Sequence, residues 1–227
     1  MKYADYIDEI EIDALWKGRK HIRWQLDPEV NVLSGGNGMG KSTILNRIIS
    51  GVKSVENGIP GLRLETMPKD ADLVRFDIIA IPDSRLEYDL NLQELNEQYA
   101  KYDNEERRKL FADIVDETFA STQKHIIRGR QEVELEQWGE PLDLRKLSSG
   151  EKHMLCILLT VLLEDCQRTV LFMDEPEASL HMEWQQRLID TIRRLNPNVQ
   201  IILTTHSPAI IMNGWLDHVT EVSDITV

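Results

Sequence analysis

The sequence predicts an α/β protein with a central, mostly parallel sheet, N-terminal antiparallel strands and an inserted α+β lobe. Residues 7–33 contain runs in which apolar and polar residues alternate, as they do in half-buried strands. A glycine-rich stretch at residues 34–43 separates an apolar run from a helical pattern. From residue 147 onward, helical and strand patterns alternate, which is typical of βαβ units on a parallel sheet.

The N-terminal strands are predicted by their period of two. Residues 7–12 read IDEIEI and residues 21–26 read HIRWQL, and apolar side chains recur in both at alternate positions. The apolar run Val30-Asn31-Val32-Leu33 then leads directly into the glycine-rich stretch. We therefore expect this run to form a strand that ends at a functional loop.

The loop itself, SGGNGMGKST, fits the pattern G-x-x-x-x-G-K-[ST] from Gly35 to Ser42, in the strand–loop–helix context that this pattern requires. Glycines allow the backbone to approach a ligand, and loop amides at a helix N-terminus favour an anionic phosphate. Lys41 would reach the β- and γ-phosphates, and Ser42 would offer its hydroxyl to Mg²⁺. The predicted nucleotide-binding residues are Gly35, Gly36, Asn37, Gly38, Met39, Gly40, Lys41, Ser42 and Thr43.

The chain is expected to form a single domain, residues 1–227, because this length can bury a full core. Within it, residues 52–146 form the expected inserted lobe, and residues 147–227 form the last part. The lobe contains strand candidates and helical segments at residues 73–81, 92–102, 105–122, 126–127 and 133–136.

A second anion site is predicted where residues 147–152 read LSSGEK and an apolar-periodic helix follows. Ser148, Ser149 and Gly150 stand directly before that helix, so their amides and hydroxyls could bind an anion. The same residues could equally serve only as a helix cap.

The next strands are expected to deliver charged side chains to one edge of the sheet. The buried run TVLFM at residues 169–173 ends in Asp174 and Glu175, which can place one carboxylate on Mg²⁺ and the other beside an attacking water. The run at residues 199–205 delivers His206, which could hydrogen-bond the γ-phosphate and that water. This edge is where α/β sheets bind ligands.

Composition limits the remaining possibilities. The net charge of −13 lacks the long-range positive field that gathers nucleic acid, so nucleic acid is not indicated, although a local groove could still hold it. No apolar stretch approaches a membrane span, and the N-terminus is too acidic for a signal peptide. Cys156 and Cys166 are expected to be buried thiols in a reducing compartment, and the protein is expected to be cytoplasmic.

The motifs GGNGMGKST, LSSGEK, LFMDEPEASLH and LTTHSP, in this order, resemble the Walker A, signature, Walker B and H-loop of ATP-binding cassette (ABC) ATPases. LSSGEK stands where transporters have LSGGQ. The DEPEASLH…THSP style is similar to prokaryotic soluble ATPases of the OLD, AbiEii and Septu type, found in phage defence and toxin systems, with SMC and RecF-like ATPases as cousins. The long coiled coils of SMC proteins are excluded, because the segment before the signature is short and has no sustained heptads.

The resemblance implies roles for individual residues. The loop glycines and Lys41 would hold phosphates, and Ser42 with Asp174 would coordinate Mg²⁺. Glu175 would polarise the attacking water, and His206 would contact the γ-phosphate. The signature residues Ser148, Ser149 and Gly150 would touch ATP bound by a second subunit, because such ATPases close head to tail around two nucleotides.

Two parts of such a site stay open. A Q-loop is not evident: Gln93 stands on a predicted helix, and the turn at residues 81–85 is the better positional candidate. The adenine platform could be Trp16 or Trp24, although tryptophans on strands more often pack in the core.

The expected function is a Mg-ATP-binding and ATP-hydrolysing switch that dimerises and controls a separate effector, a nuclease or toxin, in a prokaryotic defence-like system. A separate effector is expected because the residues after His206 are too few for an effector domain. The alternatives are a nucleotide-binding subunit of an ABC transporter and a DNA-repair or DNA-sensing ATPase.

Overall fold

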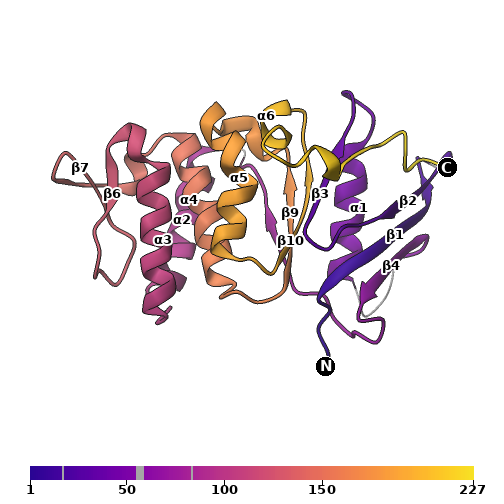
Figure 1. Ribbon diagram of the computed structural model, residues 1–227, viewed down its shortest axis with the longest axis horizontal. Coiled ribbons are helices and arrows are strands. Elements are labelled where there is room, and N and C mark those ends of the chain that lie inside the picture. The colour runs from indigo at the N-terminus through magenta and orange to yellow at the C-terminus, as the bar shows by residue number, and fades with distance from the viewer. Residues whose placement is uncertain (17, 55–58, 83) are drawn as a thin grey trace. The chain divides into compact units, whose positions relative to one another are not determined.

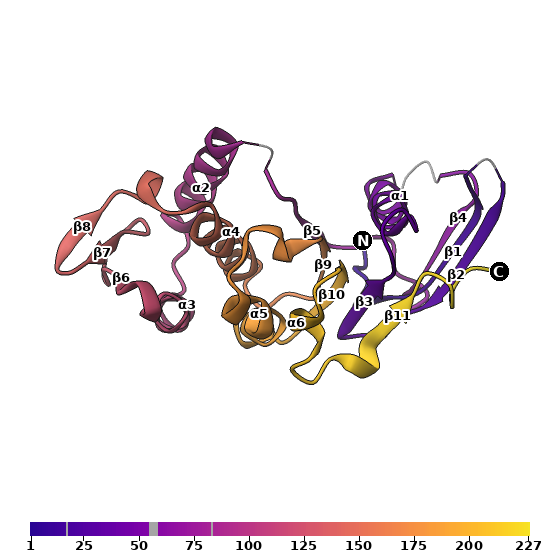
Figure 2. The same ribbon diagram turned by 90° about the horizontal axis from the view of Figure 1, so that it is seen from above.

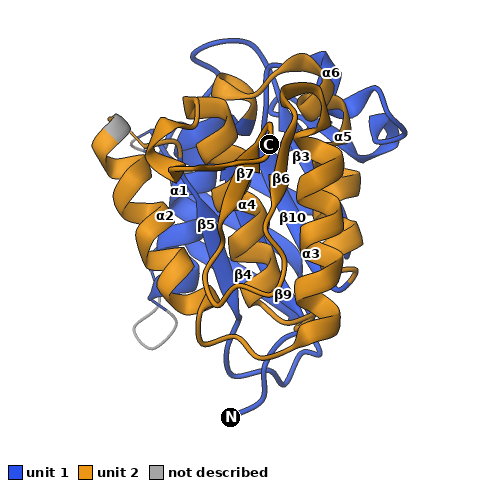
Figure 3. Cartoon of the chain, turned by 90° about the vertical axis from the view of Figure 1, so that its left-hand side faces the viewer, with its two compact units in different colours: residues 1–80, 168–176, 198–227 blue, residues 81–167, 177–197 orange. Residues whose placement is uncertain are grey.

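A computed structural model describes residues 1–16, 18–54, 59–82 and 84–227, which form two compact units (Figure 3). Unit 1 comprises residues 1–80, 168–176 and 198–227, and unit 2 comprises residues 81–167 and 177–197. Each unit is therefore assembled from separate stretches of the chain.

The larger sheet of unit 1 is parallel and has the strand order β11-β3-β10-β9-β5. Figure 1 labels its central strands β3, β10 and β9, and Figure 2 also labels β11 and β5. Its central strands are almost wholly buried, as expected for a parallel sheet. This architecture confirms the α/β class. The strands are β3 (Val30–Ser34), β5 (Phe76–Ile79), β9 (Thr169–Asp174), β10 (Val199–Thr204) and β11 (Val219–Glu221).

The second sheet of unit 1 is antiparallel, with the order β2-β1-β4 (Figure 2). It consists of β1 (Tyr6–Leu15), β2 (Lys20–Gln25) and β4 (Leu62–Met67). Ile10 and Trp24 are partners across β1 and β2, and both side chains are buried. The predicted alternation thus turns one face of this sheet into a hydrophobic core.

Helix α1 (Lys41–Lys53) packs on this core, because Ile44, Leu45 and Ile48 repeat at helical spacing and are fully buried. Burying each such side chain contributes roughly 1.5–3 kcal/mol. The short helix α6 (Pro208–Ile211) follows β10. The anchored face of α1 fixes the position of the loop that precedes it.

Unit 2 is mainly helical. Its helix α4 (Ser149–Leu163) is buried along most of its length and contacts the other three helices, α2, α3 and α5. A small antiparallel sheet, β6-β7-β8, completes the unit. The bounds are α2 (Arg85–Tyr99), α3 (Glu105–Thr118), α5 (Met182–Leu195), β6 (Lys124–Ile126), β7 (Leu135–Gln137) and β8 (Glu140–Leu142). Short 3₁₀ helices lie at Ala120–Thr122, Leu144–Lys146, Pro176–Ser179 and, in unit 1, Leu216–His218.

The expected lobe at residues 52–146 contributes to both units. Strands β4 and β5 pair with β1 and β9 of unit 1, whereas α2 to β8 belong to unit 2. The sequence did not single out β4, although residues 62–67 read LRLETM. The single domain with an inserted lobe at residues 52–146 stays a prediction.

Both cysteines are half-buried thiols, where fully buried ones were expected. Burial raises the pKa of Cys156 on α4 to about 12. In the described part of the chain, each helix is too short or too polar to span a bilayer.

Candidate functional site

The glycine-rich loop runs from the end of β3 to the start of α1, as its sequence predicts. Gly40 has a φ of 90°, in the left-handed region that favours glycine. A Cβ atom at Gly40 would also lie 2.0 Å from Cζ2 of Trp16. Gly40 therefore serves two needs, the turn into the helix and the close approach of the indole ring.

Lys41 is the most enclosed charged residue of the site, with 4% of its surface exposed. Its Nζ donates a hydrogen bond to the carbonyl oxygen of Gly35 at 3.0 Å and also contacts His206. Oε1 of Glu175 lies 4.0 Å from the same nitrogen. The three predicted catalytic residues, Lys41, Glu175 and His206, thus converge in unit 1.

A second cluster places oxygen atoms beside this group. The Ser42 hydroxyl donates to Oδ1 of Asp174 at 3.0 Å, and the Thr204 hydroxyl donates to the same oxygen at 2.5 Å. Hydroxyl and carboxylate oxygens are the ligands that Mg²⁺ prefers. The residues present therefore fit the predicted magnesium site, in which Ser42 and Asp174 would be the protein ligands.

Glu175 is held by its backbone as well as by its side chain. Its φ of 47° lies in the left-handed region, where a residue with a side chain is strained. Its N–H donates to both the carbonyl and the hydroxyl oxygen of Thr204, each at 3.1 Å. Oε1 of Glu175 lies 3.1 Å from Nε2 of His206. The carboxylate is therefore directed to a defined position next to His206.

The remaining loop residues have distinct surroundings. Asn37, Gly38 and Met39 are exposed in the middle of the loop, and Thr43 is exposed on the first turn of α1. Gly36 is also exposed, whereas Gly35 is partly buried. All the residues predicted from the loop, Walker B and the H-loop thus lie in unit 1.

The signature residues Ser148, Ser149 and Gly150 belong to unit 2, at the start of α4. Ser148 caps the helix through a reciprocal pair of hydrogen bonds with Glu151. A Cβ atom at Gly150 would lie 2.3 Å from the carbonyl oxygen of Ser179. The cap that the sequence suggests is therefore present; whether the segment also binds an anion stays a prediction.

The two candidate adenine platforms differ in exposure. Trp24 is 2% exposed, and its indole N–H donates to the Thr220 hydroxyl at 3.3 Å, so it is a core residue. Trp16 is 37% exposed and lies against Gly40 of the loop. Of the two, Trp16 alone presents an accessible ring beside the predicted phosphate site.

The Q-loop position stays a prediction. Gln93 lies on α2 in unit 2, where its amide donates to Glu97 at 3.2 Å. The alternative turn at residues 81–85 includes Asp83, which lies outside the described residues.

Sequence reasoning missed one residue of this site, Thr204. Its hydroxyl joins Asp174 to the backbone of Glu175, and its side chain is fully buried. The available signal was a hydroxyl residue at the end of an apolar strand, directly across from the carboxylate pair in a parallel sheet.

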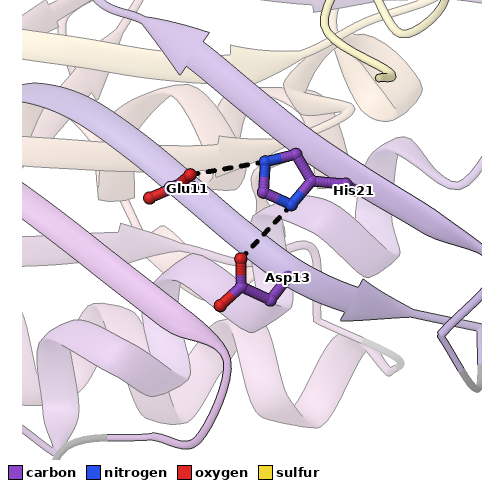
Figure 4. Close-up of side chains that lie close together, drawn as sticks. All are labelled: Glu11, Asp13 and His21. Carbon is purple, nitrogen blue, oxygen red and sulfur yellow. Dashed lines mark ion pairs between the residues drawn. The ribbon is translucent and has the colours of Figure 1, made fainter.

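Among the described residues, one further group has metal-ligand chemistry: Glu11, Asp13 and His21 (Figure 4). Nε2 of His21 lies 3.4 Å from Glu11 and Nδ1 lies 3.3 Å from Asp13, so the carboxylates contact different ring nitrogens. Arg63 pairs with both carboxylates. A single cation would bind one ring nitrogen, so this group is an ion-pair network on the surface of the sheet.

Comparison with known proteins relates the C-terminal part of the chain to a described family. The family "AAA domain, putative AbiEii toxin, Type IV TA system" matches residues 136–213. The chain is 23% identical to "Retron Vc95 probable ATPase" of Vibrio cholerae serotype O1 biovar El Tor, over 53% of this chain and 25% of that protein. It is 32% identical to "Retron Ec83 probable ATPase" of Escherichia coli, over 33% of this chain and 17% of that protein. The chain thus spans a quarter or less of the length of these relatives.

Solved structures share the fold over nearly the whole chain. The SMC head domain from Thermotoga maritima matches with a TM-score of 0.58 at 15% identity, and the match covers 95% of this chain and 94% of that domain. The SMC head bound to the C-winged helix domain of ScpA has the same TM-score of 0.58 at 16% identity, with coverage of 92% and 91%. The chain therefore has the fold of these SMC head domains.

Proposed function

We propose that the chain is an ABC-type P-loop ATPase, similar to the prokaryotic AbiEii-like group, and that it works as a Mg-ATP-dependent switch. In this proposal, ATP closes two copies head to tail, and hydrolysis to ADP and phosphate releases them. The switch controls a separate effector, a nuclease or toxin, in a prokaryotic defence-like system, and it acts in the cytoplasm.

The observation that carries the proposal is the convergence of Lys41, Glu175 and His206 beside the Ser42–Asp174 pair. These side chains come from the carboxyl ends of β3, β9 and β10, or from the residues that follow them. The carboxyl edge of a parallel sheet is where such folds bind nucleotides. Phosphoryl transfer mainly needs positioning and charge neutralisation, and this set supplies both.

Each residue has a role that follows from its position. The Lys41 ammonium would bind phosphate oxygens, and Mg²⁺ held by Ser42 and Asp174 would neutralise their charge. The Glu175 carboxylate would accept a hydrogen bond from the attacking water and direct its lone pair toward phosphorus. His206, next to Glu175, would bond the γ-phosphate and so respond to its presence.

The signature residues at the start of α4 and the similarity to retron proteins support a role as a switch. Helix α4 begins at Ser148, Ser149 and Gly150, and the amides of a helix N-terminus favour an anion. The γ-phosphate of ATP bound by a second copy would be such an anion. The relatives are named as probable ATPases of retrons, and the description of the matching family mentions a toxin and a type IV TA system. Loss of a γ-phosphate is a common trigger for the release of such contacts.

The decisive variant is Glu175→Gln. It keeps the size of the side chain but removes the base, so turnover should fall by roughly 10²–10⁴-fold. Fluorescent ATP binding should persist, and light scattering should detect a longer-lived dimer in Mg-ATP. The control Glu65→Gln removes an exposed carboxylate from β4 in the same unit and should hydrolyse ATP normally. Normal turnover by Glu175→Gln would contradict the assignment of the base.

A further inference from the structure

A buried ion pair connects strand β6 with the first turn of α4. Nζ of Lys124 lies 2.7 Å from Oε1 of Glu151, and the two side chains are 11% and 6% exposed. Ion pairs at this depth are uncommon, because burying two charges costs desolvation energy that close geometry must offset. The other contacts of Glu151 show which part of unit 2 this pair holds in place.

Glu151 holds the signature segment, residues 148–150, through its second oxygen. Oε2 accepts a hydrogen bond from the backbone N–H of Ser148 at 2.8 Å, while the Ser148 hydroxyl accepts one from the N–H of Glu151 at 3.3 Å. The carboxylate of Glu151 thus joins Lys124 to the backbone of Ser148, the first residue of the signature segment. Gly150, on the same turn, is packed against the backbone of Ser179.

The charge of Glu151 depends on these contacts. Burial by itself would raise the pKa of Glu151, but hydrogen bonds from Lys124 and Ser148 outweigh it and lower the pKa below its ordinary value. Without Lys124, a carboxylate would stay buried without its counter-ion. It would then have to leave its position or take up a proton, and either change disturbs the cap at Ser148.

We propose that Lys124 is a positioning residue for the signature segment. Through Glu151 it holds the loop from Ser148 to Gly150 in the conformation that contacts the ATP of a second copy of this chain. This inference rests on the ATP-bridged dimer of the proposed function. It assigns to the inserted segment before the signature a direct influence on closure of that dimer.

The chain contains a matched control for a purely structural role. Lys152, the next residue on α4, is fully buried and forms an ion pair with Asp89 of α2, whose side chain is 24% exposed. Asp89→Asn leaves a buried lysine without its counter-ion, just as Lys124→Met leaves a buried glutamate. The Asp89 pair joins two helices, whereas the Lys124 pair is bonded onward to the Ser148 backbone. Both variants weaken unit 2, but Lys124→Met alone should affect the dimer.

A compensating variant makes the test specific. Glu151 stands where the LSGGQ form of the motif has glutamine, which is neutral and still able to accept the Ser148 hydrogen bond. In the double variant Lys124→Met/Glu151→Gln, no buried charge lacks a partner. The cap is retained, so the double substitution should leave dimerisation unchanged.

The experiment measures dimerisation by analytical ultracentrifugation in Mg-ATP, in a Glu175→Gln parent that does not consume the nucleotide. Lys124→Met should raise the dimer dissociation constant by about tenfold or more, whereas Asp89→Asn and the double variant should stay within about threefold of the parent. Binding of a fluorescent ATP analogue to the monomer should change by less than about twofold in every variant. Thermal unfolding shows whether the two single variants are destabilised to a similar extent.

The outcomes separate this inference from the function on which it rests. A parent that stays monomeric in Mg-ATP would overturn the proposed dimer, and this role with it. A parent that dimerises, with Lys124→Met unchanged or weakened no more than Asp89→Asn, would overturn the role of Lys124 alone. Selective loss in Lys124→Met with rescue by the double variant is the supporting result.

Discussion

At the scale of single residues, one side chain of the site forms hydrogen bonds with two of its neighbours. Thr204 bonds the carboxylate of Asp174 and the backbone N–H of Glu175 through one hydroxyl group. It thereby links the residue assigned to Mg²⁺ with the residue assigned to the water. This link also helps to hold Glu175 in its left-handed backbone conformation.

Thr204→Val tests that link, because valine has the same shape without the hydroxyl. We expect the turnover number to fall by about tenfold or more, and stability to fall by about 1–3 kcal/mol because a buried hydrogen-bonding group loses its partner. Steady-state hydrolysis and urea unfolding measure the two effects. Thr118→Val removes a hydroxyl that bonds a backbone carbonyl in α3 and should leave turnover intact. An equal effect of both variants would contradict a specific role.

At the scale of elements, two short connections shape the nucleotide site. The loop between β3 and α1 carries Gly40, and the turn between β1 and β2 carries Trp16 against it. The ammonium of Lys20 lies 5.5 Å from the centre of the same indole ring. A hairpin of the antiparallel sheet thus supplies an aromatic surface beside a loop of the parallel sheet.

Trp16→Ala tests whether this surface stacks on the adenine base. Stacking of a base on an aromatic ring contributes about 1–3 kcal/mol, so the dissociation constant for ATP should rise by roughly 5- to 150-fold. Trp16→Phe should restore most of the affinity, and inorganic triphosphate, which has no base, should bind equally to all forms. Trp138→Ala, at an exposed hairpin in unit 2, is the control. Unchanged ATP affinity in Trp16→Ala would exclude the platform.

At the scale of the whole molecule, the predicted motifs are divided between two units. Unit 1 contains the phosphate loop, Asp174, Glu175 and His206, whereas unit 2 contains the signature segment. In the proposed switch, unit 1 would bind ATP and unit 2 would contact the ATP of a second copy. Its net charge of −13 favours protein partners over nucleic acid.

The partner itself can be sought with tagged Glu175→Gln protein, purified from its native cells in Mg-ATP. We expect a nuclease or toxin to copurify, because the variant prolongs the closed dimer to which an effector would respond. A parallel purification with Lys41→Ala, which should not hold ATP, identifies the partners that depend on the nucleotide. Copurification of integral membrane proteins would favour a transporter subunit. DNA that copurifies and dissociates with salt would favour a DNA sensor.

Local patterns predicted much of this organisation correctly. The strand, glycine loop and helix around residues 30–53 depend on contacts within a few residues, so their sequence alone predicts them. The same holds for the buried strands before Asp174 and His206 and for the cap at Ser148. Element boundaries were less accurate: α2 begins at Arg85, several residues before the predicted helix.

The sequence by itself determined the fold class, the order of the motifs and the strand–loop–helix form around the glycine-rich loop, because these follow from periodicity and spacing along the chain. Only the tertiary structure decided that Trp16, and not Trp24, stands beside the loop, that Thr204 completes the site, and that Lys124 meets Glu151. Those contacts join residues far apart in sequence. They depend on strand order and register, such as the pairing of Thr204 with Asp174, which no local pattern encodes.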